Sequence, residues 1–246
     1  TQFDRLSSVT LHNVEIWRTS TPEPSALPGI IWTFIKDVSK YVPLFATSGT
    51  LILDLDNIVD PSQGLTGEYD VTLSATFFAS SAKHPPAKTA NAIIPISNLS
   101  PNTANHVSVP PAFSINQTFP INTIEAYAEL YASGNGNEEF WYFNVANQFF
   151  NDLPAGFALP DGPFREVRLL VDGQVAGVAY PYPVFFTGAI TPPAWRPITS
   201  YGALDQPTYF IDLTPFVPIL ANGKPHNLTI DVVSGETNHT INDNWY

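Results

Sequence analysis

The sequence predicts an all-β protein with two tandem jelly-roll-like antiparallel β-sandwich domains packed side by side. Residues 37–55 and 212–232 share one pattern: an Asp that caps a helical turn, an aromatic-Val-Pro-aliphatic run, a Gly turn and an alternating strand. The 24 Pro and 14 Gly favour short strands, and the 17 Phe and 10 Tyr suit them. A long unit that recurs once indicates two similar domains.

The first domain is expected over residues 1–90. It begins with a hairpin of strands 6–11 and 14–17, which turns at His12 and Asn13. A Pro-rich loop follows, and then the repeated capped turn. The other strands expected in this domain lie at 30–35, 51–55 and 69–78.

The second domain is expected over residues 119–246 and repeats this order. Residues 91–118 form the expected linker, with one edge strand at 92–96. The second hairpin turns at Asp172 and Gly173. Its flanking strands occupy 167–171 and the residues from 175 onward, and a further strand is expected at 209–211.

Aligning the two hairpins sets Arg5 against Arg165 and Asp4 against Phe164. The aspartate is therefore peculiar to the first copy. The acidic Gly-Asn-Gly-Asn-Glu-Glu segment that contains Glu138 and Glu139 has no counterpart in the first copy either.

Composition excludes several classes of protein. The net charge is −12 with only 10 Lys plus Arg, so a nucleic-acid partner is not expected. This acidity fits either solubility or adaptation to an acidic medium. No apolar run is long enough to span a bilayer, so no membrane association is expected. Without Cys or a Gly-x-Ser-x-Gly motif, we expect no thiol or serine nucleophile, and we expect no metal or cofactor.

Four sequons carry the pattern for N-glycosylation, and they favour a secreted or extracellular location, with a vacuolar one as the alternative. The absence of Cys does not decide the compartment. The acceptor residues of the sequons are Asn98, Asn116, Asn227 and Asn238.

Carboxylates beside aromatic residues are the best candidates for chemistry. Asp4 lies between Phe3 and Arg5, and Glu138 and Glu139 precede three aromatic residues. Apolar surroundings raise the pKa of a carboxyl group toward the range that suits an acid or a base, and a nearby Arg lowers or orients it. The alternatives are a surface ion pair for Asp4 and Arg5, and a solvated role for one of the two glutamates.

Four segments of the chain carry a resemblance to a known family. They are Ile16-Trp-Arg-Thr-Ser-Thr-Pro-Glu-Pro24, Trp32-Thr-Phe-Ile-Lys-Asp-Val38, Gly134-Asn-Gly-Asn-Glu-Glu-Phe-Trp-Tyr142 and Phe164-Arg-Glu-Val-Arg168. They resemble the acidic peptide-N4-(N-acetyl-β-glucosaminyl)asparagine amidases, the peptide:N-glycanase A group of plants and fungi, and the resemblance covers residues 1–246. It implies hydrolysis of the amide bond between asparagine and the innermost GlcNAc of N-glycopeptides or glycoproteins, which yields aspartate and a glycosylamine.

A more distant similarity to the bacterial glycanase of the F type implies roles for single residues. Phe3-Asp4-Arg5 matches the last three positions of its acid-aromatic-Asp-Arg motif, with Gln2 in place of the acid, and implies that Asp4 is the principal catalytic residue. Glu139 or Glu138 corresponds to its second acid, with Asp161 as a competing alignment. The residues implied in substrate binding are Arg5, Asp56, Asn57, Asn135, Trp141, Asp161 and Arg165.

The family is longer than this sequence, and its members are cut into two chains that stay associated. The resemblance therefore implies a second chain from the same processed precursor as a partner. Two rival functions are a carbohydrate-binding lectin module and a glycosidase that uses a pair of carboxylates.

Overall fold

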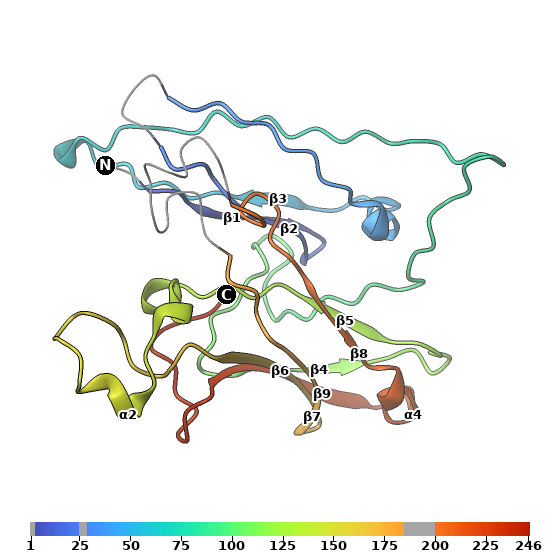
Figure 1. Cartoon of the computed structure of the whole chain (residues 1–246). Helices are drawn as coiled ribbons and strands as arrows, with labels where there is room; N and C mark the ends of the chain where they lie inside the picture. Colours follow the sequence, from blue (N-terminus) through green and yellow to red (C-terminus); the bar gives the residue numbers. More distant parts are fainter. Residues whose placement is uncertain (1–2, 25–28, 185–199) are drawn as a thin grey trace. The chain divides into compact units, whose positions relative to one another are not determined.

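A computed structural model describes residues 3–24, 29–184 and 200–246 (Figure 1). It confirms the all-β class, because antiparallel strands dominate and every helix described is a single short turn. The strands are β1 Leu6–Leu11, β2 Val14–Ser20, β3 Leu51–Asp54, β4 Phe113–Thr118, β5 Tyr127–Leu130, β6 Arg165–Val171, β7 Gln174–Ala179, β8 Tyr209–Asp212 and β9 Pro225–Ser234. The short helices are η1 Ser39–Tyr41, α1 Val42–Phe45, η2 Pro61–Gln63, η3 Gly136–Glu138, η4 Trp141–Phe143, α2 Asn147–Phe150, η5 Thr214–Phe216 and α4 Val217–Leu220.

The chain forms two compact units. Unit 1 comprises Thr1–Asn105 and Val184–Gln206, and unit 2 comprises His106–Pro183 and Pro207–Tyr246. The domain bounds and the jelly-roll arrangement expected from the sequence remain predictions. No helix within the described ranges is long and apolar enough to cross a membrane.

Unit 1 is built on a three-stranded antiparallel sheet in the order β2-β1-β3. The β1–β2 hairpin turns at His12 and Asn13, whose φ angles of 53° and 61° are those of a type I′ turn. Its core gathers hydrophobic side chains from both strands and from the turn after residue 38. The buried members are Val9, Leu11, Ile16 and Tyr41.

Unit 2 contains a four-stranded sheet in the order β4-β9-β6-β7 and a separate β5–β8 pair. Strand β6 alternates buried and partly exposed residues, and its buried side chains Val167, Leu169 and Val171 lie in the core. The β8 strand lies close to β7, since a Cβ atom at Gly177 would be 2.3 Å from Cγ2 of Ile211. The glycine therefore permits the close approach of these two strands.

The internal repeat is confirmed in both units. Each hairpin has a register shift at the same place, between Val9 and Thr10 in β1 and between Leu169 and Leu170 in β6. Each capped turn has an Asp whose Oδ1 accepts the backbone N–H two residues later at 2.8 Å. These aspartates are Asp37 and Asp212.

The edges of the repeated sheets differ. In unit 2, β9 pairs with β6 on one side and with β4 on the other. In unit 1, β3 occupies the place of β9 but pairs only with β1 among the described residues. No strand within the part of the chain that the structure describes pairs with the other side of β3.

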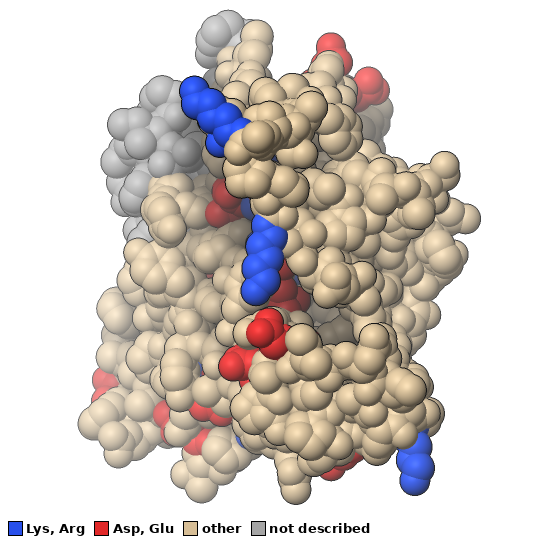
Figure 2. Space-filling model, turned by 90° about the vertical axis from the view of Figure 1, so that its right-hand side faces the viewer, with Lys and Arg blue, Asp and Glu red and all other residues tan. Residues whose placement is uncertain are grey.

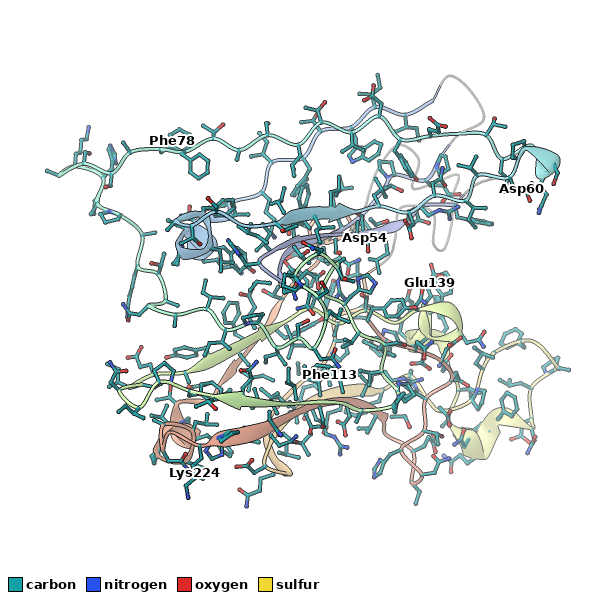
Figure 3. All side chains as sticks on the ribbon, turned by 180° about the vertical axis from the view of Figure 1, so that it is seen from behind. Asp54, Asp60, Phe78, Phe113, Glu139 and Lys224 are labelled. Carbon is teal, nitrogen blue, oxygen red and sulfur yellow. The ribbon has the colours of Figure 1, made fainter. Side chains whose placement is uncertain are left out.

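Three predicted strands, at 30–35, 69–78 and 92–96, form no ladder with any described residue. The expectation of strands there was wrong for this structure. Alternating apolar residues give a segment one apolar face, but a β-strand also requires a partner with which to hydrogen bond. Val71, Leu73 and Phe78 are exposed, and Figure 3 shows Phe78 on its long extended segment.

Charged side chains are sparse. Asp, Glu, Lys and Arg make up 13% of the chain, and on the face shown in Figure 2 most atoms belong to other residues. Each buried charge is therefore a candidate for a specific structural or chemical role.

Candidate active site

The β1–β2 hairpin places Asp4 beside the loop that follows β2. Leu6 pairs with Ser20, so the residues before β1 lie opposite those after β2. Arg5 continues this pairing: its backbone N–H donates to Oγ1 of Thr21, and its carbonyl accepts the N–H of Thr21, both at 2.9 Å. The backbone at Asp4 is therefore fixed by the hairpin.

The Asp4 carboxyl group is half-buried and lies next to a second acid. Its Oδ2 accepts a hydrogen bond from Oγ of Ser20 at 3.1 Å, and its backbone N–H donates to Oε2 of Glu23 at 3.0 Å. Burial raises the pKa of Asp4, the Ser20 hydrogen bond lowers it, and the charge and hydrogen bonding of Glu23 raise it, so that the net shift is upward. A carboxylate with a raised pKa is a stronger base when ionised.

Arg5 lies beside Asp4. Its Nη1 donates to the carbonyl oxygen of Asp4 and its Nε to Oδ1 of Asn57, both at 3.4 Å. Asn57 is held in turn by a 2.7 Å hydrogen bond to the carbonyl of Gly67. Asp56 precedes Asn57 and is exposed. The structure thus brings Asp4, Arg5 and Asn57 together, with Asp56 adjacent in the chain.

A hollow of about 300 Å³ lies in unit 1 near Ser20. Phe34 forms one side of the hollow and stacks on Trp17 with ring centroids 5.7 Å apart. The backbone N–H of Ser20 donates to the carbonyl of Ala203 at 2.7 Å, which ties the end of β2 to the segment that lines the hollow. The lining residues are Phe34, Ser200, Tyr201, Gly202, Leu204 and Asp205.

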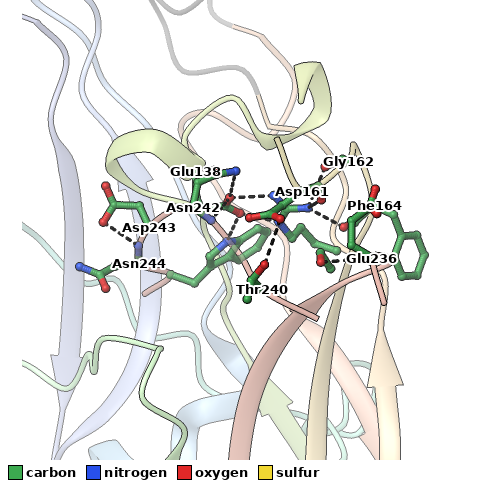
Figure 4. Close-up of polar contacts among 12 residues, drawn as sticks. Glu138, Asp161, Gly162, Phe164, Glu236, Thr240, Asn242, Asp243 and Asn244 are labelled. Carbon is green, nitrogen blue, oxygen red and sulfur yellow. Dashed lines mark hydrogen bonds and ion pairs between the residues drawn. The ribbon is translucent and has the colours of Figure 1, made fainter. Parts of the chain in front are cut away.

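Glu138, in unit 2, is fully buried in an ion pair with Arg165 (Figure 4). Arg165 donates from Nε and Nη2 to the two carboxylate oxygens of Glu138 at 2.5 and 2.7 Å. Its Nη1 donates to the carbonyls of Asp161, Gly162 and Phe164. Both side chains are thus enclosed and fully engaged within the protein.

Residues near the end of unit 2 complete this cluster. Asn242 donates its backbone N–H to Oε1 of Glu138 at 2.9 Å, and Trp245 donates its indole N–H to Oε2 at 2.9 Å. Burial raises the pKa of Glu138, but the hydrogen bonds from Arg165, Trp245 and Asn242 and the charge of Arg165 lower it by more, so that the net shift is downward. Glu138 is therefore held as a carboxylate.

Glu139 lies in a different environment from its neighbour. It is partly exposed and projects from the short helical turns η3 and η4 (Figure 3). Burial raises the pKa of the Tyr142 phenol, and the negative charge of Glu139 raises it further. Glu139 is thus an accessible carboxylate beside aromatic residues.

The other predicted site residues of unit 2 differ in accessibility. Trp141 is buried, with its ring centroid 5.9 Å from that of Trp245, which is a packing contact. Asp161 is buried and accepts hydrogen bonds at Oδ1 from Asn147 and Thr240 at 3.2 and 3.0 Å. Asn135 is exposed.

Sequence reasoning missed Glu23 and Ser20 beside Asp4, and Asn242 and Trp245 around Glu138. The first two could have been found by extending the hairpin register past Leu6, because that register sets residues before β1 against residues after β2. The last two had no local signal, since they lie 104 and 107 residues from Glu138.

The described residues contain no group of three or more His, Asp or Glu side chains that could hold a metal ion. The chain is thus an all-β protein whose best candidate groups for chemistry are accessible carboxylates, with Arg5 beside one of them. It belongs to the family of peptide N-acetyl-beta-D-glucosaminyl asparaginase amidase A, whose family model matches residues 1–246.

A curated relative is the peptide-N4-(N-acetyl-beta-glucosaminyl)asparagine amidase A of Prunus dulcis. The two sequences are 36% identical over 252 residues, which cover 95% of this chain and 43% of the relative. The chain therefore spans less than half the length of the relative that it matches. No solved structure matches the chain.

Proposed function

We propose that this chain forms part of a peptide:N-glycanase. The enzyme hydrolyses the amide bond between asparagine and the innermost GlcNAc of N-glycopeptides or glycoproteins. The products are a peptide with aspartate in place of asparagine and the intact glycan as a glycosylamine. The observation that carries this proposal is the family match over the whole chain, together with a relative named for the same activity.

Asp4 is the general base in this proposal. The water oxygen attacks the amide carbonyl carbon while Asp4 takes a proton from the water. The tetrahedral intermediate then breaks its C–N bond, and the proton passes to the departing nitrogen, so that the products are a carboxylic acid and a glycosylamine. Support comes from the half-burial of Asp4 and the upward shift of its pKa.

Arg5 stabilises the negative charge that develops on the carbonyl oxygen. Its guanidinium group lies beside Asp4 and is oriented by Asn57. Asp56, Asn57 and Asn135 are the predicted substrate-binding residues that remain at least partly exposed, and we assign them to contacts with the sugar or the peptide.

Glu139 is the second catalytic acid in this proposal. Glu138 and Asp161 are both buried, and the hydrogen bonds to their carboxylate oxygens come from within the protein. Glu139 is partly exposed and can reach a ligand without unfolding its turn. Arg165 and Trp141 are buried as well, and a structural role suits them better than a sugar contact.

The test is Asp4→Asn in the full-length enzyme, assayed on a glycopeptide at mildly acidic pH. Removal of a general base is expected to lower kcat by roughly 10²- to 10⁴-fold. Asp70→Asn is the matched control, because it removes an exposed carboxylate from the same unit. Near-native turnover of Asp4→Asn would overturn the assignment of the base.

Product analysis tests the reaction itself. An amidase leaves aspartate on the peptide and an intact chitobiose end on the glycan. A glycosidase would leave one GlcNAc on asparagine, and a lectin would leave the substrate unchanged. Either of these two outcomes would overturn the proposed function.

A second chain from the same precursor is the proposed partner. Two observations support it: the relative is more than twice as long as the matched region, and one edge of β3 has no strand beside it among the described residues. An open strand edge is a ready template for another strand. We place a strand from the remainder of the protein at this edge.

A secreted or vacuolar location is supported by the accessibility of the sequons. Asn98, Asn116 and Asn238 are exposed. Asn227 lies across from Asn116 in the β4–β9 pair, and its Nδ2 donates to Oδ1 of Asn116 at 3.2 Å. Mass spectrometry of tryptic peptides from the native protein tests this proposal, and unmodified asparagine at all four positions would contradict it.

A further inference from the structure

Glu23 is a buried acid in the loop that follows β2, between Pro22 and Pro24. It is 4% exposed, and its Oε2 accepts the backbone N–H of Asp4 at 3.0 Å. Burial of a carboxyl group is costly unless the surroundings compensate for the lost hydration. Its presence against Asp4 therefore requires an explanation beyond packing.

The surroundings of Asp4 form a small network of ionisable and hydroxyl groups. Arg5 directs its guanidinium group to the Asp4 carbonyl and to Asn57. Tyr69 shares a 3.2 Å hydrogen bond with the hydroxyl of Thr21, which in turn holds the N–H of Arg5. Glu23 accepts the backbone N–H of Asp4, so its carboxyl group lies beside residue 4.

A negative charge beside a carboxyl group opposes its ionisation, because the second charge must form next to the first. Burial is the largest cause that raises the pKa of Asp4, and the charge and hydrogen bonding of Glu23 raise it further. The ionised Asp4 is therefore a stronger base with Glu23 beside it.

We propose that Glu23 is a positioning residue for Asp4: it fixes the backbone at residue 4 and places a negative charge beside the Asp4 side chain. This inference rests on the proposed amidase function. Glu23 exchanges no atom with the substrate. It raises the pH above which Asp4 can accept a proton from the attacking water, and it increases the strength of Asp4 as a base.

Glu23→Gln in the full-length enzyme tests the negative charge of residue 23 separately from the shape of its side chain. A glutamine keeps the size of the side chain and an oxygen that can accept the Asp4 N–H, but it carries no negative charge. We expect the acid limb of the pH profile of kcat/KM to move to lower pH. We also expect a lower maximal kcat, because Asp4 becomes a weaker base.

Two variants serve as controls. Glu23→Asp keeps the charge and should return the acid limb toward its original position. Glu68→Gln removes an exposed carboxylate from the same unit and should leave the acid limb in place. An acid limb that does not move in Glu23→Gln would overturn the inference. Inactivity of Asp4→Asn would show in the same series that the proposed function still stands.

Thermal unfolding of Asp4→Asn gives a second readout that does not depend on activity. The pKa of Asp4 is raised above its unfolded value of 3.8, so stability is lost as the pH rises through the folded pKa. Asp4→Asn should therefore have a higher Tm than the parent at neutral pH, and the gain should shrink as the pH falls. Burial is the largest cause of the raised pKa and the charge of Glu23 adds to it, so the gain should be smaller in the Glu23→Gln background than in the parent. An equal gain in both backgrounds would contradict a role for the charge of Glu23.

Discussion

Glu138 and Glu139 are neighbours in the chain, yet their environments are opposite. The turn η3 directs Glu138 inward to Arg165 and leaves Glu139 partly exposed. The same residue type therefore serves stability at one position and, in our proposal, chemistry at the next. This assignment predicts that substitution of Glu138 mainly lowers stability, whereas substitution of Glu139 mainly lowers turnover.

Glu138→Gln is expected to destabilise unit 2 by about 3–5 kcal/mol, because it leaves the buried guanidinium group of Arg165 without its counter-charge. Glu139→Gln should lower turnover and leave stability nearly unchanged. Urea denaturation together with glycopeptide turnover measures both effects. Equal losses of stability in the two variants would contradict the assignment.

The low pKa of Glu138 also predicts how stability depends on pH. Its folded pKa lies below the unfolded value of 4.5, so its contribution is complete above that value and is lost as the pH falls through the folded pKa. Unit 2 should therefore keep this stabilisation at mildly acidic pH and lose it in stronger acid. Glu138→Gln should show a weaker acid dependence of its urea midpoint than the parent.

At the scale of elements, the repeat shows which parts of the fold have local causes. The hairpin turns and the two capped turns were predicted from the sequence, because Asn, Asp and Gly determine such turns through their own backbone preferences. The strand at 69–78 was not predicted correctly, because the pairing of a strand depends on distant residues.

The candidate site also has features that the sequence predicted and features that it did not. Asp4 and the acidic pair were found from the sequence, since each lies in a short motif. The inward direction of Glu138 depends on Arg165, 27 residues away, and on Trp245, 107 residues away. The pairing of Asp4 with Glu23 spans 19 residues and depends on the hairpin register. A motif of a few neighbouring residues cannot reveal contacts between residues so far apart in the sequence.

The contact between β7 and β8 gives a prediction at this scale. In Gly177→Ala the new Cβ would lie 2.3 Å from Cγ2 of Ile211, a β-branched side chain with little freedom to move. We expect a loss of about 1–3 kcal/mol from this overpacking, measured by urea denaturation. Gly67→Ala is the control, because nothing lies within 4 Å of its added Cβ. Equal midpoints for the two variants would show that β8 shifts at no cost.

At the scale of the whole molecule, the edge of β3 away from β1 predicts a difference between this chain alone and the complete protein. Amides of residues 51–53 that point away from β1 should exchange with solvent quickly in the isolated chain and slowly in the complete protein. Hydrogen exchange with mass spectrometry measures this, and equal protection in both would contradict the proposed strand.

Measurement of the intact mass tests directly whether a second chain is bound. The native protein is expected to show a larger mass under non-denaturing conditions than under denaturing ones, since two chains separate on denaturation. A single species of 26.9 kDa under both conditions would contradict the proposal.

Trp245 is a part of the unit 2 core that is synthesised late. It exchanges backbone hydrogen bonds with Val109 at 2.7 and 2.9 Å, and its indole reaches Glu138. On a growing chain, Trp245 cannot enclose Glu138 until residue 245 has left the ribosome. The β1–β2 turn is local in sequence, but the hairpin also pairs with β3 and bonds to the carbonyl of Ala203, so its contacts too are completed later. A ribosome that stalls before residue 242 would thus leave the Glu138–Arg165 pair without Asn242 and Trp245.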